Sequence, residues 1–253
     1  MRKITVTLGL VIIVLFAATV SAHAEIVSFT DNHKYWDGWG NGTGDDNSDT
    51  IGIPNFKDGQ ATVGSNRLNN LTFNRYAGTS SYWGILSPGD LFIDVGSNDT
   101  WDYVVDLTSW TVPGPLDLDV DAVAGYYNIY SLSLGLNSAT GYIKSGSDKS
   151  GEWAGWLIRD DHPVAADLAA LKAAQIGSAY FSGWENGNTT QYSFDFDGLN
   201  LGNSGQFTIG WQPNCANDVV YENLNYHATP EPATLALLGV GLVGLLKLKR
   251  RKA

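Results

Sequence analysis

Cysteine is almost absent from this sequence, with Cys215 the only one among 253 residues. An intrachain disulfide is therefore excluded, and stability must come from a packed core, with or without bound cations. Cys215 is best explained as a small buried side chain, and the alternatives are an intermolecular disulfide or an anchor for a modification. A nucleophilic role would need a neighbouring base, and the sequence identifies none.

Basic residues are also scarce, at 15 Lys and Arg against 26 Asp and Glu. Two of the basic residues lie in segment 1–24 and five in segment 228–253, where Glu231 is the single acidic residue. Segment 25–227 therefore keeps 8 basic and 25 acidic residues, and its net charge is near −17. Nucleic acid is not an expected partner, because its binding requires a basic surface.

Motifs of common enzyme classes are missing as well. The sequence contains no His-Glu-x-x-His, no Gly-x-Ser-x-Gly, no clustered Cys and His, and no phosphate-binding glycine loop. Glu152 and Glu185 each adjoin a tryptophan, an arrangement that a glycoside hydrolase or lyase could use. Because any chain rich in acids and tryptophans offers such pairs, we expect a protein that is not an enzyme, with a polysaccharide-active enzyme as the less favoured alternative.

The N-terminus has the three parts of a secretory leader. Arg2 and Lys3 are positively charged, residues 4–20 are almost entirely apolar, and Ala22 and Ala24 flank His23 as a small-x-small cleavage site. The pattern predicts a signal peptide over 1–24, export through the Sec translocon, and cleavage after Ala24.

The C-terminus has three parts in a fixed order. Pro230-Glu231-Pro232 precedes an apolar run over 235–246, and a basic cluster occupies 247–253. The run has 12 residues, fewer than the roughly 20 that cross a bilayer comfortably, although a thin membrane or snorkelling lysines would accommodate it. The basic cluster is expected on the cytoplasmic side.

This tail resembles the PEP-CTERM sorting signal of Gram-negative bacteria. The resemblance implies processing near Pro230-Glu231-Pro232 by an exosortase, a membrane cysteine transpeptidase. It also implies transient anchoring in the inner membrane through the C-terminal segment, and delivery to the cell envelope, the cell surface or the extracellular matrix. We therefore divide the chain into a signal peptide (1–24), an acidic domain (25–227) and a sorting signal (228–253).

Short apolar or alternating runs separated by Gly, Asn, Asp and Ser fill the acidic domain, which predicts an all-β fold. Residues 160–175 differ from this pattern. An Asp precedes Pro163 in what would be the first helical turn, Ala and Leu dominate the rest, and Gly177 follows as a helix stop signal. These features predict one short helix. We expect a single jelly-roll-like β-sandwich with that helix, an N-terminal signal helix and a C-terminal membrane helix. The predicted strands are 26–29, 61–63, 68–76, 91–95, 103–107, 126–134, 153–158, 179–184, 191–196, 206–211 and 219–224.

Two acidic segments offer oxygen ligands for calcium. Asp45, Asn47 and Asp49 have the first spacings of an EF-hand loop, but the later Gly and Glu positions of that loop are not matched. The second segment joins two predicted hairpin strands, 91–93 and 103–105, and contains Asp94, Asp99 and Asp102. Ordinary solvated acidic loops are the favoured interpretation of both, and calcium is the one cofactor to test.

Taken together, these features predict a secreted surface or matrix protein with a non-catalytic interaction role in the envelope or an exopolysaccharide layer. The alternative is a calcium-dependent carbohydrate-binding module, in which tryptophan rings stack on sugars. Its candidate glycan contacts are Trp36, Trp39, Trp153 and Trp184.

Overall fold

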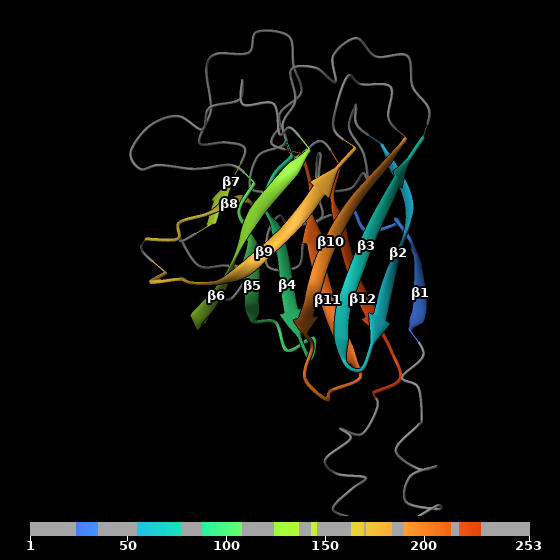
Figure 1. Ribbon diagram of the computed structural model, residues 1–253. Coiled ribbons are helices and arrows are strands. Elements are labelled where there is room, and N and C mark those ends of the chain that lie inside the picture. Colours follow the sequence, from blue (N-terminus) through green and yellow to red (C-terminus); the bar gives the residue numbers. More distant parts are fainter. Residues whose placement is uncertain are drawn as a thin grey trace, which may run out of the picture.

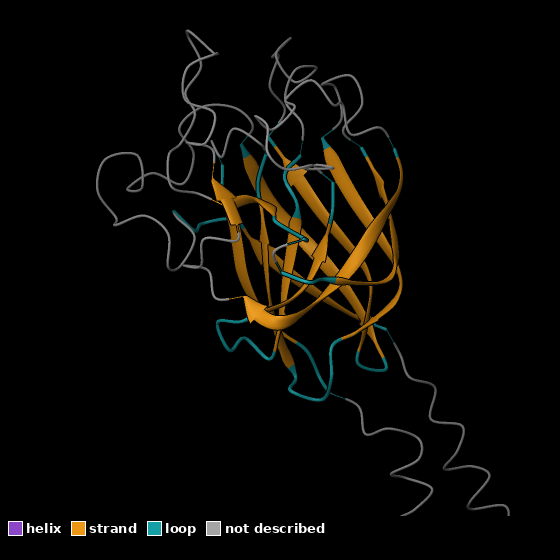
Figure 2. Ribbon diagram, turned by 90° about the vertical axis from the view of Figure 1, so that its left-hand side faces the viewer, coloured by secondary structure: helices purple, strands orange, loops and turns teal. Residues whose placement is uncertain are grey.

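The computed structural model describes residues 24–34, 55–76, 88–107, 124–136, 143–145, 163–169, 171–183, 190–213 and 218–228. Over these residues the protein is all-β and has no helix (Figure 2). Consequently no helix there is long and apolar enough to cross a membrane. The strands are β1 (Glu25–Thr30), β2 (Phe56–Gly64), β3 (Arg67–Arg75), β4 (Leu91–Val95), β5 (Trp101–Val105), β6 (Gly125–Leu136), β7 (Ile143–Ser145), β8 (Pro163–Ala166), β9 (Ala174–Ser182), β10 (Gln191–Asn200), β11 (Gln206–Trp211) and β12 (Val220–Asn225).

Ten strands form one antiparallel sheet in the order β1-β2-β3-β10-β9-β6-β5-β4-β11-β12, and β7 pairs with β8 separately (Figure 1). Jelly rolls consist of two separate sheets, whereas here the pairing continues from β1 to β12. β6, a strand of 12 residues, connects the strands β1-β2-β3-β10-β9 to the strands β5-β4-β11-β12, because it pairs with β9 on one side and β5 on the other. The predicted sandwich is thus one continuous sheet whose two halves face each other.

Alternation of buried and exposed side chains explains why these segments are strands. In β3, Leu71 and Phe73 are buried, whereas Asn70, Thr72 and Asn74 lie on the outer face. Successive side chains of a strand point to opposite faces, so a period of two separates core from surface. The same pattern holds in β10, the neighbour of β3 in the sheet.

Trp211 of β11 lies at the centre of the core and is fully buried. Its ring centroid is 4.5 Å from that of Phe73, 5.0 Å from that of Phe56 and 5.4 Å from that of Phe194. Its Nε1–H donates to the carbonyl oxygen of Gly89 at 3.1 Å. Because β11 belongs to one half of the sheet and β2, β3 and β10 to the other, Trp211 holds the two halves together.

The sheet is nearly closed, since its edge strands β1 and β12 lie beside each other. At one end, Glu25 Oε2 accepts the backbone N–H of His227 at 2.7 Å. At the other end, the His33 and Tyr221 rings lie 5.1 Å apart. No ladder pairing joins β1 to β12 among the residues that the structure describes. Both ends of the acidic domain therefore leave the sheet at the same pole.

The helix predicted over 160–175 is wrong where the structure describes it. Pro163–Ala166 forms β8, and Ala174 and Gln175 begin β9. Gly177, expected after the helix, lies within β9 opposite Ile129. Pairing of β8 with β7, and of the start of β9 with β6, overrides the helix propensity of the alanine-rich sequence.

Candidate functional site on the outer face of the sheet

The outer face of β1, β2, β3, β10, β9 and β6 carries three rows of side chains that cross the strands, and we call this surface the polar face. Directly paired residues define each row, and alternation with the buried core residues places them all outward. The first row is Ile26–Thr62–Asn70–Asp195–Tyr180–Tyr126, the second Ser28–Gln60–Thr72–Ser193–Ser182, and the third Thr30–Asp58–Asn74–Gln191.

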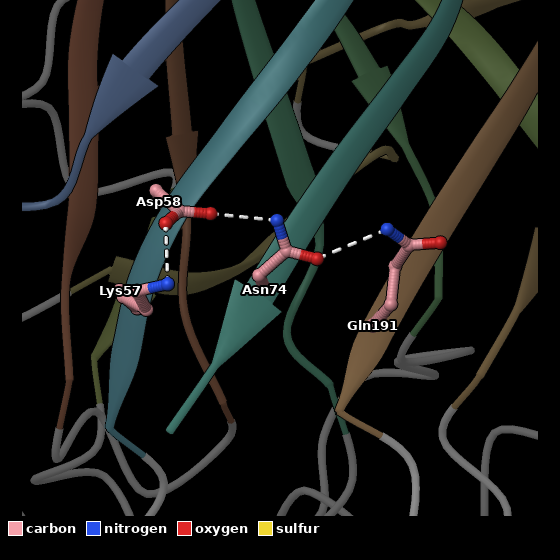
Figure 3. Close-up of polar contacts among 4 residues, drawn as sticks. All are labelled: Lys57, Asp58, Asn74 and Gln191. Atoms are coloured by element: carbon pink, nitrogen blue, oxygen red, sulfur yellow. Dashed lines mark hydrogen bonds and ion pairs between the residues drawn. The ribbon is translucent and has the colours of Figure 1, made fainter. Parts of the chain in front are cut away.

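Hydrogen bonds connect the side chains along these rows. In Figure 3, the Asn74 amide nitrogen donates to Asp58 Oδ1 at 2.6 Å, and the Gln191 amide nitrogen donates to Asn74 Oδ1 at 3.0 Å. Lys57 Nζ lies 3.1 Å from Asp58 Oδ2. The hydrogen bond from Asn74 lowers the pKa of Asp58 most, and the ammonium group of Lys57 lowers it further. Asp58 therefore stays a carboxylate at neutral pH.

Two tyrosines end the first row. The side chain of Tyr126 is 78% exposed, and its ring centroid lies 5.1 Å from that of Tyr180 in an edge-on arrangement. Nearby on the same face, the Gln175 amide nitrogen donates to Asn128 Oδ1 at 2.9 Å. The face therefore combines an aromatic pair, in which the Tyr126 ring is exposed and Tyr180 is half-buried, with oriented amides.

The predicted hairpin of 91–93 and 103–105 is confirmed, since Leu91 pairs with Val105 and Ile93 with Tyr103. Asp94 is buried and accepts the backbone N–H groups of Asn98 and Thr100. Asp102 accepts the N–H of Val95 at 2.7 Å. These carboxylates cap the connecting turn.

Burial raises the pKa of both Asp94 and Asp102, although the hydrogen bonds from backbone N–H groups oppose the rise. Asp99 lies in the same turn with a left-handed φ of 63°. No group of three or more His, Cys, Asp or Glu side chains is arranged to hold a metal in the described part of the chain. A calcium ion bound by Asp94, Asp99 and Asp102 stays a prediction.

The start of the domain contacts its end through Glu25 and His227. Besides the backbone hydrogen bond, Glu25 Oε1 lies 2.8 Å from His227 Nδ1. Both contacts lower the pKa of Glu25, and the hydrogen bond from the His227 backbone N–H has the larger effect. Tyr226 is buried, and its hydroxyl donates to the carbonyl oxygen of Leu201 at 3.0 Å. Ala24, the predicted cleavage residue, therefore lies at the pole where Ala228 leaves the domain.

Many predicted site residues lie outside the described part of the chain. They are Ala22, Trp36, Trp39, Asp45, Asn47, Asp49, Glu152, Trp153, Trp184, Glu185, Cys215, Pro230, Glu231 and Pro232, together with the strand expected over 153–158.

Sequence reasoning missed Tyr126 and Tyr180 as surface residues. Alternation alone indicates that one residue of the Tyr126–Tyr127 pair faces outward, and likewise one of Tyr180–Phe181. Which one it is depends on the pairing of β6 with β9, strands that are far apart in the sequence.

Comparison with protein families matches residues 228–252 to the model described as the PEP-CTERM protein-sorting motif. Comparison with curated proteins and with solved structures found no match.

Proposed function

Because the chain carries a PEP-CTERM protein-sorting motif at residues 228–252, we propose that it works outside the cell as a non-catalytic interaction protein of the surface or extracellular matrix. The motif marks the chain for export and exosortase-dependent sorting to the cell surface. The interaction role is the step beyond the motif. Its support is the polar face, which presents side chains of the kind that bind ligands.

The arrangement of the domain ends supports the same proposal. The Glu25–His227 contact brings the predicted signal-peptide junction next to the first residue of the sorting motif. A domain anchored for a time in the inner membrane by segment 235–246 would then face the membrane with one pole. The polar face runs along the side of the sheet and would stay accessible before and after processing.

The sorting part is tested by replacing Pro230, Glu231 and Pro232 together with alanine in the producing cell. We expect the C-terminal processing of the chain to stop and its amount at the surface to fall, because exosortase recognition is lost. Thr234→Ser, a conservative change just outside the Pro-Glu-Pro triplet, serves as the control and should leave processing unchanged. Unchanged tail processing in the triple variant would refute the sorting part.

The non-catalytic part is tested separately on the exported protein. We expect no release of reducing ends and no unsaturated uronate product from a panel of polysaccharides. Release that disappears in Glu152→Gln or Glu185→Gln would instead establish the glycoside hydrolase or lyase alternative.

A further inference from the structure

We infer that the polar face binds a neutral polysaccharide, whose chain runs across the strands along the first row and stacks a sugar ring on Tyr126. The inference rests on the proposed function in naming the ligand of an extracellular interaction protein. It differs from the sequence prediction in its residues, because it rests on Tyr126 and Tyr180, whereas the tryptophans proposed as glycan contacts lie outside the described part of the chain.

The dimensions of the first row suit a polymer. It crosses six adjacent strands from Ile26 to Tyr126. Five inter-strand steps of about 4.8 Å give a length of about 24 Å. A surface of this length contacts several consecutive sugar rings, so modest contacts at each ring add up.

The tyrosine pair supplies the aromatic contact. Tyr126 is mostly exposed and so contributes little to the core, while Tyr180 beside it fixes the orientation of its ring through the edge-on contact. An aromatic ring buries the apolar face of a sugar, and the phenol hydroxyl adds a hydrogen bond. Two rotatable bonds make this contact inexpensive in conformational entropy.

Polar side chains in the middle of the row are already oriented. The Asn70 amide nitrogen donates to Ser193 Oγ at 2.9 Å and also to the Asp195 carboxylate. Carboxylate and amide oxygens accept hydrogen bonds from sugar hydroxyls, and an amide NH2 group donates to them. Because these side chains are held before binding, less entropy is lost when the ligand docks.

The charge of the face favours a neutral polymer over an anionic one. The three rows contain the carboxylates of Asp58 and Asp195 and no lysine or arginine. Of the flanking cations, Lys57 is paired with Asp58, and Arg67 donates to the Gly198 carbonyl oxygen at 2.7 Å. A polyuronate would meet the Asp195 carboxylate with no cationic side chain in the three rows to offset it, which disfavours its binding.

The test uses the protein recovered from the surface of the producing cells, with cellulose and dextran as neutral probes and polygalacturonate as the anionic probe. Tyr126→Ala and Tyr180→Ala are compared with Tyr76→Ala, which removes a tyrosine that is 57% exposed and lies outside the rows. We expect binding to a neutral probe that weakens about fivefold or more in the first two variants and is unchanged in the third. Tyr126→Trp keeps a stacking ring and should retain binding.

Three outcomes would overturn the inference: no binding to either neutral probe, stronger binding to polygalacturonate, or equal losses in Tyr126→Ala and Tyr76→Ala. Thermal unfolding of each variant confirms that it is folded. Because binding is measured in vitro, its failure leaves the sorting result untouched, and a sorting failure leaves the binding result untouched.

Discussion

Replacement of Trp211 tests whether one aromatic side chain holds the two halves of the sheet together. Its ring lies within 6.3 Å of the rings of five aromatic residues, namely Phe56, Phe73, Phe181, Tyr192 and Phe194. Trp211→Ala removes a fully buried ring, which costs about 3–5 kcal/mol, and the hydrogen bond to Gly89, which contributes about 1 kcal/mol. Trp211→Phe keeps part of the packing and should cost about 2–3 kcal/mol.

Urea unfolding of the exported protein, followed by far-ultraviolet circular dichroism, measures these losses at a fixed pH. Tyr76→Ala is the matched surface control and should stay within about 0.5 kcal/mol of the parent protein. If Trp211→Ala lost no more free energy of unfolding than this control, the account of the core would be wrong.

Three further predictions concern stability. Asp90 is buried, and both of its carboxylate oxygens accept backbone N–H groups. Asp90→Asn should therefore lower the free energy of unfolding by about 2–4 kcal/mol. Asp195→Asn, at an exposed position, is the control and should change the free energy of unfolding little; equal losses in the two variants would contradict the role of Asp90. The folded-state pKa of Glu25 is lowered below its usual 4.5. The carboxylate therefore stabilises the fold above pH 4.5, and this contribution is lost as the pH falls through the folded-state pKa. The stability difference between the parent and Glu25→Gln should shrink on acidification, which urea midpoints measured over a range of acidic pH would show. A Cβ at Gly59 would lie 2.2 Å from a Phe29 ring carbon, whereas one at Gly177 meets nothing within 4 Å, so only Gly59→Ala should lower the melting temperature strongly.

The strands could be predicted from the sequence because alternation is a local signal. Ten of the predicted segments coincide with or overlap strands of the main sheet, and the 91–105 hairpin is correct because its partners are neighbours in the chain. The order of the sheet could not be predicted, since β3 pairs with β10 and β4 with β11 through contacts between distant segments. The false helix shows the same limit, because its alanines favour a helix locally, whereas pairing with β7 and β6 makes strands of its two described ends.

The candidate site was less predictable than the fold. The sequence identifies Asp94 and Asp102 as candidate ligands, but only the folded hairpin shows that their oxygens accept backbone N–H groups. The polar face depends on register across six strands, and a change of one residue in any pairing would turn that strand's row inward. By contrast, the sorting motif is a linear sequence signal and needed no structure to be found.

Mass spectrometry of the protein recovered from the cell surface tests the central claim most directly. The account predicts a chain that begins at Glu25, without residues 1–24, and ends near Pro230-Glu231-Pro232, without the apolar run and the basic cluster. A full-length mass from the cytosol, with leader and tail both intact and no processed form at the surface, would contradict it.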